Sequence, residues 1–260
     1  MQATASDGKT LPELKAEHQV APRGRLDAPG EESEQSPYRN YVRDLILGLN
    51  DGIVSVYALV AGLAGAAALF SPRQVGVAGI AAAIAGALSM GLGEYLSTKS
   101  QAQYYAAEAR REREHIRTYP DLEKAELREM LEEQNYPPEL RKPMIDHIAG
   151  SEDRFVEFMM REEFGVGKES GRSPVAAMLL IMAAFLVGAA LPVLPFLAAP
   201  ASHPLWAASA LSILGLLGAG AAKGKISGLS PLRSGIEMVV FGAVAGLVTY
   251  GVGRLIPGTG

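Results

Sequence analysis

The sequence contains no cysteine and only four histidines. Without cysteine, the protein has no disulfide bond, no thiolate metal ligand and no cysteine nucleophile. The shortage of both residue types also argues against a structural zinc site. An excess of positive charge is missing too, since the formal net charge is -4. Nucleic-acid binding needs a basic surface, so we expect no nucleic-acid partner.

Acidic residues are scarce over most of the chain. More than half of the 28 Asp and Glu residues lie between Ser100 and Arg172, and Glu237 is the only one after that segment. From Leu45 onward the rest of the chain consists mostly of Ala, Gly, Leu, Val and Ile. From Leu45 onward the sequence therefore divides into apolar regions and one charged segment, residues 100–172.

Five apolar stretches are long enough, or nearly so, to cross a bilayer, which takes roughly 20 residues per helix. A soluble helical bundle would need a polar face on each helix, yet residues 175–197 contain no charge. Gly, Ala and Ser are frequent in all five stretches and allow membrane helices to approach closely. We predict an all-α membrane protein with spans near residues 45–70, 75–96, 175–197, 204–222 and 236–256.

The predicted organisation has four parts. Residues 1–40 are polar, with many Pro, Glu and Ser and no apolar run, so we expect a disordered tail without a signal peptide. Residues 41–99 form the first two spans, residues 100–172 a helical domain, and residues 173–260 the last three spans.

Basic residues predict the orientation of these spans. Those on the amino-terminal side include Arg39, Arg43, Lys99, Lys223, Lys225 and Arg233, whereas Arg73 and Arg254 lie on the other side. Cytoplasmic loops are enriched in Lys and Arg. The amino terminus and the charged segment are therefore expected to be cytoplasmic.

Proline and glycine divide residues 97–172 into helices. We expect the second span to continue as a helix up to Pro120, and further helices to cover about 121–135, 139–150 and 151–165. The last helix starts after Ser151, carries the stretch FMMREEFG and is predicted to end at Gly165 and Gly167.

Several potential metal ligands share helical faces in this segment. Met159 and Met160 lie four and three residues before Glu163, which places all three on one face. Two more pairs, each with a spacing of three, lie on either side of the break at Pro120: Glu112 with His115, and Glu123 with Glu126. Core packing by the methionines and solvation of the acids are the alternative explanations.

This ligand set combines carboxylates, one imidazole and two thioethers. Carboxylate alone suits magnesium or calcium, whereas a soft thioether adds affinity for later first-row metals. Ferrous iron tolerates the mixture, and Zn2+, Co2+, Mn2+ and Ni2+ also remain possible.

Three predicted spans contain acidic residues, of which Glu237 lies next to the start of the fifth span and four residues after Arg233, a spacing that allows an ion pair. Asp51 lies near the start of the first span, and Glu94 lies near the end of the second, four residues after Met90. A central Asp costs about 3 kcal/mol on insertion scales, so an acid inside a span is a functional candidate. The alternative is an interfacial acid that reaches water. Asp51, Met90 and Glu94 repeat the ligand types of the charged segment, as expected if one ion visits both regions.

Three sequence stretches resemble the vacuolar iron transporter family, the yeast calcium-cross-complementer type of iron and manganese carriers. They are RDLILGLNDGIVSVYALVAGLAGA, SMGLGEYLSTKSQ, and FMMREEFGV followed by Ser-Pro. The resemblance covers roughly residues 41–256. It implies a five-span homodimer in the lipid bilayer that exports Fe2+ from the cytosol by proton-coupled antiport, with the ion path between the two first helices.

The resemblance also implies roles for individual residues. The path would use Asp51, Met90 and Glu94. The cytoplasmic domain would bind metal through Glu112, Glu123, Glu126, Met159, Met160 and Glu163. His115 stands where the family commonly has Glu, and Glu108 is a candidate to compensate for that loss of charge.

Two other functions remain open. One is a membrane-anchored iron storage or ferroxidase domain, because Glu112 and His115 form a Glu-x-x-His motif of the di-iron type. The second such motif is missing, since Met144 and not an acid lies three residues before His147. The other is a carrier for manganese or another divalent ion, or a carrier that uses the charged segment only as a dimer clamp. The Ala- and Gly-rich, cysteine-free composition suggests a bacterial plasma membrane, or a vacuolar or organelle membrane if the source is eukaryotic.

Overall fold

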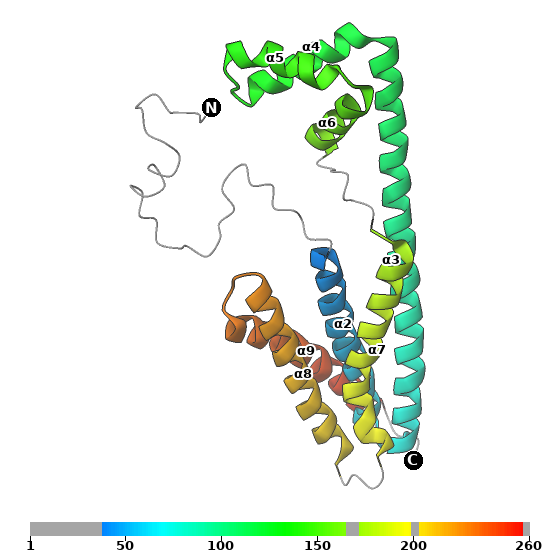
Figure 1. Ribbon diagram of the computed structural model, residues 1–260. Coiled ribbons are helices and arrows are strands. Elements are labelled where there is room, and N and C mark those ends of the chain that lie inside the picture. Colours follow the sequence, from blue (N-terminus) through cyan, green and yellow to red (C-terminus); the bar gives the residue numbers. More distant parts are fainter. Residues whose placement is uncertain (1–37, 165–171, 199–202, 257–260) are drawn as a thin grey trace, which may run out of the picture. The chain divides into compact units, whose positions relative to one another are not determined.

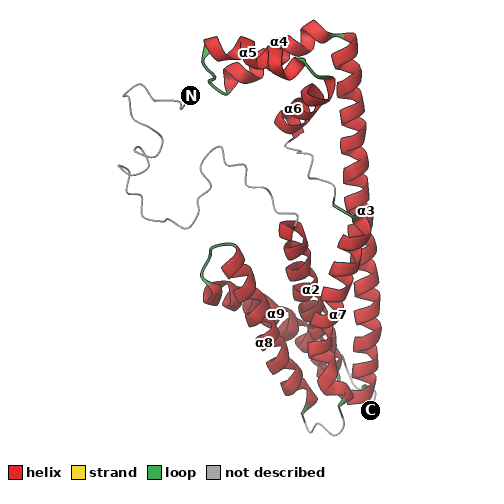
Figure 2. Cartoon of the chain, viewed as in Figure 1, coloured by secondary structure: helices red, strands yellow, loops and turns green. Residues whose placement is uncertain are grey.

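The computed structural model describes residues 38–164, 172–198 and 203–256. Within these ranges all regular structure is helical (Figures 1 and 2). The helices are α2 (Tyr38–Gly65), α3 (Pro72–Thr118), α4 (Pro120–Glu133), α5 (Pro138–Ala149), α6 (Glu152–Phe164), α7 (Pro174–Leu197), α8 (Pro204–Ile226) and α9 (Pro231–Leu255). Most of the predicted disordered tail, and the predicted helix end at Gly165 and Gly167, lie outside the described residues, but residues 38–40 of that tail belong to α2.

Five of these helices, α2, α3, α7, α8 and α9, are long and apolar enough to cross a membrane. This confirms the all-α prediction with five spans. The first span differs at its edges, because α2 begins at Tyr38 and ends at Gly65 and not near Phe70. The next helix begins soon after Gly65, with Ser71 as its N-cap and Pro72 at its first position.

Ser-Pro pairs mark the starts of three spanning helices. The Ser71 side chain accepts a hydrogen bond from the backbone N–H of Gln74. The side-chain oxygen of Gln74 in turn accepts one from the backbone N–H of Ser71. Ser173 caps α7 in a similar way, through the N–H of Ala176. The first N–H groups of a helix have no backbone acceptor within the helix, and the serine oxygen accepts a hydrogen bond from one of them. Proline at the first position has no N–H and therefore needs no acceptor.

Helix α3 is longer than a bilayer is thick. Its 47 residues extend about 70 Å at 1.5 Å per residue, against a hydrocarbon thickness of about 30 Å. The apolar first half is therefore the span, and the charged second half continues without interruption as far as Thr118 (Figure 1). This confirms the predicted continuation to Pro120, which is the first residue of α4.

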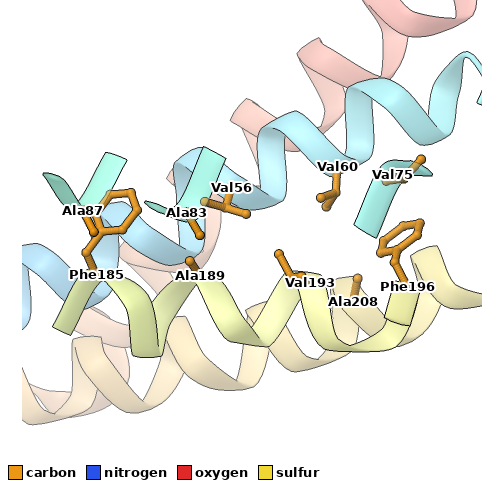
Figure 3. Packing of buried hydrophobic residues seen from close by; sticks show 10 residues of the cluster. All are labelled: Val56, Val60, Val75, Ala83, Ala87, Phe185, Ala189, Val193, Phe196 and Ala208. Atoms are coloured by element: carbon orange, nitrogen blue, oxygen red, sulfur yellow. The ribbon is translucent and has the colours of Figure 1, made fainter. Parts of the chain in front are cut away.

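The spanning helices share an apolar core. Ten buried residues from α2, α3, α7 and α8 form it, and Figure 3 shows them at one interface: Val56, Val60, Val75, Ala83, Ala87, Phe185, Ala189, Val193, Phe196 and Ala208. Close approach depends on glycine. A Cβ atom on Gly48 would lie 2.6 Å from the carbonyl oxygen of Ile181, so α2 and α7 are in backbone contact there.

Large apolar side chains also point outward from the spans. On α3 they follow the helical spacing at Val77, Ile80, Ile84, Leu88 and Leu92, all more than 40% exposed. A soluble monomer rarely exposes a continuous apolar stripe of this length, whereas lipid is a suitable environment for it. The protein is an integral membrane protein.

Helices α4, α5 and α6 have a core of their own. Leu127 and Leu131 of α4 are fully buried against Ile145 of α5 and against Phe155 and Met159 of α6. This core fixes which faces of α4 and α6 are turned inward, and so which side chains meet the charged half of α3.

Candidate metal sites

Ion pairs align α6 along the charged half of α3. Arg113 and Arg117 of α3 both bind Glu152 at the start of α6, at 2.9 Å and 2.8 Å. At the other end of α6, the Phe164 ring meets the Tyr104 ring edge to face, with centroids 6.4 Å apart. The two helices are therefore antiparallel, and the later residues of α6 lie beside earlier turns of α3.

This alignment gathers acidic side chains around Glu112, a buried residue of α3 with 8% exposure. Burial, the charges of Glu123, Glu163 and Glu126, and a hydrogen bond with Glu123 together raise the pKa of Glu112 to about 8, and burial is the largest cause. Glu123 is itself 3% exposed. Carboxylates crowded without a cation retain protons, and a metal ion can displace them.

Glu163 belongs to the same cluster, although its side chain is exposed. Partial burial and the charges of Glu126, Glu123 and Glu108 raise the pKa of Glu163, whereas His115 lowers it. The imidazole Nδ1 of His115 lies 3.6 Å from a carboxylate oxygen of Glu123. The helical break at Pro120 thus brings the two predicted pairs together, and α6 adds Glu163.

Glu108 has a competing partner. Its carboxylate accepts a hydrogen bond from Arg111 of the same helix at 2.9 Å. Within the described ranges, no three Asp, Glu or His side chains are arranged as a ready-made metal site. Metal binding by this cluster therefore requires side-chain rearrangement, and the ligand roles remain predictions.

The two methionines of α6 are both buried. Met159 has no exposed surface and belongs to the α4–α6 core, as the core-packing alternative expects. Met160 is 6% exposed and lies three residues before Glu163, on its face of the helix. The packing explains the presence of Met159 without any metal, whereas Met160 is not a member of that core cluster.

The predicted path residues lie on α2 and α3. Asp51 is half-buried on α2, and Met90 packs at the edge of the spanning core. The Glu94 carboxylate accepts hydrogen bonds from the Thr98 hydroxyl and from the Arg172 guanidinium, both at 3.0 Å. Glu94 is therefore held in place and is not simply reaching for water at the membrane surface.

Two charged residues near Glu94 were missed by the sequence reasoning. Asp44 of α2 is completely buried and pairs with Arg172, which directly precedes the Ser173 cap of α7. In the sequence both look like ordinary charges flanking a span. The one available signal was the seven-residue spacing from Asp44 to Asp51, which puts both acids on one face of α2.

Comparison with known proteins places this architecture in a family. The model of the VIT family matches residues 42–254. Vacuolar iron transporter 1 of Oryza sativa subsp. japonica is 33% identical over 260 residues, covering 98% of both chains. Vacuolar iron transporter 1 of Arabidopsis thaliana is 36% identical over 83% of this chain and 86% of its own. Protein CCC1 of Saccharomyces cerevisiae is 31% identical over 81% and 67%, respectively. The chain belongs to the VIT family.

Proposed function

We propose that this protein transports ferrous iron across its membrane, out of the cytosol and in exchange for protons. The observation that carries the proposal is the match along nearly the whole chain to a relative named as an iron transporter. Acidic side chains within three of the five candidate spans support it, because such residues are costly in lipid and mark ion pathways. The protein is thus a transporter and not an enzyme.

The charged segment would collect metal on the cytoplasmic side. Glu112 and Glu163 lie among further carboxylates, and their pKa values are raised by burial and by those neighbours. A bound dication would supply the positive charge that these carboxylates lack and would release the protons that they retain. His115 replaces one carboxylate of the family pattern with a neutral ligand, and Glu108 adds negative charge nearby.

The ion would then pass to Glu94 and Met90, and on to Asp51. Carboxylate with thioether is a ligand set that ferrous iron accepts, and Mn2+, Co2+ and Zn2+ fit it as well. Protonation of an acid in the path from the far side would weaken its hold on the ion and couple release to proton movement. We further propose a homodimer, with the path between the two copies of α2.

Flux measurements in proteoliposomes test this function. With a pH gradient imposed, the protein should move Fe2+, detected by an enclosed metal-sensitive dye, and move protons in the opposite direction. Asp51→Asn removes the central charge that holds the ion and should lower flux by roughly a hundredfold, the effect of a few kcal/mol. Thermal unfolding should remain near that of the native protein.

Asp146→Asn is the matched control, because Asp146 is an exposed acid of α5 paired with Lys142. It should leave flux unchanged. Absence of Fe2+ movement by the native protein would refute iron transport, whereas normal flux in Asp51→Asn would remove only Asp51 from the path.

A further inference from the structure

Three charged residues from different elements meet near the start of the first and third spans and the end of the second. Asp44 is in the second turn of α2, Glu94 lies on α3, and Arg172 lies just before α7. The Arg172 guanidinium pairs with both carboxylates, through Nη2 to Asp44 and through Nη1 to Glu94 at 3.0 Å. Arg172 therefore ties the first, second and third spans together at this point.

All three side chains are shielded from water. The exposed fraction is zero for Asp44, 13% for Glu94 and 15% for Arg172. A buried carboxylate without a cation is strongly destabilising, so Arg172 is what makes the buried Asp44 tolerable. Arg43 cannot replace it, because Arg43 lies 4.0 Å from Asp44 and its own side chain is 68% exposed.

The cluster is nevertheless incompletely satisfied. Two carboxylates face one buried guanidinium, and the second negative charge is opposed only by the exposed Arg43. Apart from these ion pairs, neither oxygen of Asp44 has a hydrogen-bond partner among the described residues. The other neighbours are Arg43 beside Asp44, the Thr98 hydroxyl on Glu94, and the Tyr41 ring, 5.7 Å from the Arg172 guanidinium. A dication between the two carboxylates would balance their charge and use the free lone pairs.

The cluster is also continuous with the predicted path. Asp44 and Asp51 lie on one face of α2, about 10 Å apart along the helix axis. Met90 lies one turn from Glu94 on α3. An ion held between Asp44 and Glu94 would thus have thioether and carboxylate ligands one to two turns further into the membrane.

We propose that Arg172 is a positioning residue that occupies, in the ion-free protein, the place between Asp44 and Glu94 that an arriving dication takes. The inference rests on the proposed transport function and adds Asp44 to the ion path. When the ion arrives, Arg172 is displaced, and the start of α7 is released from α2 and α3. Arg172 thereby competes with the ion, which keeps the site from holding it too tightly.

Thermal unfolding of the detergent-solubilised full chain tests this exchange, with Mn2+ as an air-stable probe. Arg172→Gln should unfold at a lower temperature than the native protein without metal, because Asp44 is left buried and unpaired. Added Mn2+ should stabilise this variant more than the native protein, because the ion supplies the missing charge. The acidic cluster around Glu112 is the same in both proteins, so the difference reports on the site of Arg172.

Transport supplies a second readout. In proteoliposomes, Arg172→Gln should lower KM for Mn2+ by about tenfold and lower kcat as well, because the ion binds without a competitor and leaves slowly. Arg172→Lys keeps a cation but loses the fork that reaches both acids, so its KM should be intermediate. Lys225→Gln, which changes an exposed cation of α8, should match the native protein.

A purely structural role predicts something different. Arg172→Gln would then be less stable but show the same Mn2+ shift and the same KM as the native protein, and this result overturns the proposal.

If Arg172→Gln does not fold, Asp44→Asn combined with Arg172→Gln removes the unpaired charge. That double variant should fold and show no Mn2+ shift beyond the native one; an enhanced shift would exclude Asp44 as a ligand. Absence of flux in the native protein would refute transport itself, while the thermal shifts still decide the exchange.

Discussion

At the scale of single residues, Glu112 shows how the acidic cluster responds to pH. Its pKa is raised to about 8 by burial first and by neighbouring carboxylates second. Between the ordinary value of 4.5 and about 8, the folded protein keeps a proton that the unfolded chain has lost. The contribution of Glu112 to folding stability therefore declines as pH rises through this window.

Metal binding to the cluster should consequently strengthen with pH. If one proton on Glu112 must leave, the association constant for Mn2+ should rise by up to about tenfold per pH unit below pH 8 and level off above it. Calorimetry in buffers of different ionisation enthalpy measures both the affinity and the released proton. Glu112→Gln should weaken binding and flatten the pH dependence.

The control for this prediction is Glu139→Gln, a change of an exposed acid in the first turn of α5. It should retain the native pH profile. A native profile that is flat between pH 6 and 8 would contradict a proton held at Glu112.

At the scale of elements, the contact between α2 and α7 is set by glycines. A Cβ atom on Gly52 would clash with the carbonyl oxygen of Phe185, and one on Gly188 would clash with that of Leu49. The two helices therefore touch through their backbones beside Asp51. In lipid such packing stabilises helix association without a hydrophobic driving force.

Gly52→Ala should force these helices apart. Overpacking of this kind costs about 1–3 kcal/mol, although alanine in a helix gains up to about 1 kcal/mol over glycine. We expect a net loss of stability, seen as a lower unfolding temperature in detergent. Gly218→Ala is the matched control, since its Cβ would meet no atom within 4 Å, and it should be neutral or stabilising. Equal unfolding temperatures for the two variants would show that the contact is not tight.

At the scale of the whole molecule, an odd number of candidate spans in the described residues predicts that the start of α2 and the end of α9 lie on opposite sides of the membrane. The charged segment follows the second span, and His203 lies between the third and the fourth. The predicted orientation puts the charged segment in the cytoplasm and His203 outside it. The absence of cysteine makes this directly testable.

Single cysteines should report the orientation. A membrane-impermeant maleimide should label His203→Cys in intact cells, but label Glu133→Cys only after permeabilisation, because the two exposed positions lie on opposite sides. The unsubstituted protein provides the unlabelled background. The reverse pattern would invert the orientation and the proposed direction of transport.

Predictability differed between the fold and the site. Length and hydropathy identified five spans, because a bilayer demands long apolar helices wherever they lie in the sequence. A spacing of three residues predicted that Glu112 shares a helix face with His115, and Met160 with Glu163, because helical neighbours are fixed locally. The charge relation between Asp44 and Arg172 involves residues far apart in the chain, so no local pattern could reveal it.

The sequence by itself determined that this chain is a helical membrane protein, which helices it contains and which side chains share a face. Local backbone geometry and the aversion of lipid to unpaired polar groups are sufficient for that. Only the tertiary structure decided that Met159 fills a core, that Glu112 is buried among acids, and that Arg172 bridges Asp44 and Glu94. These facts depend on how helices pack against one another, and packing brings distant residues together.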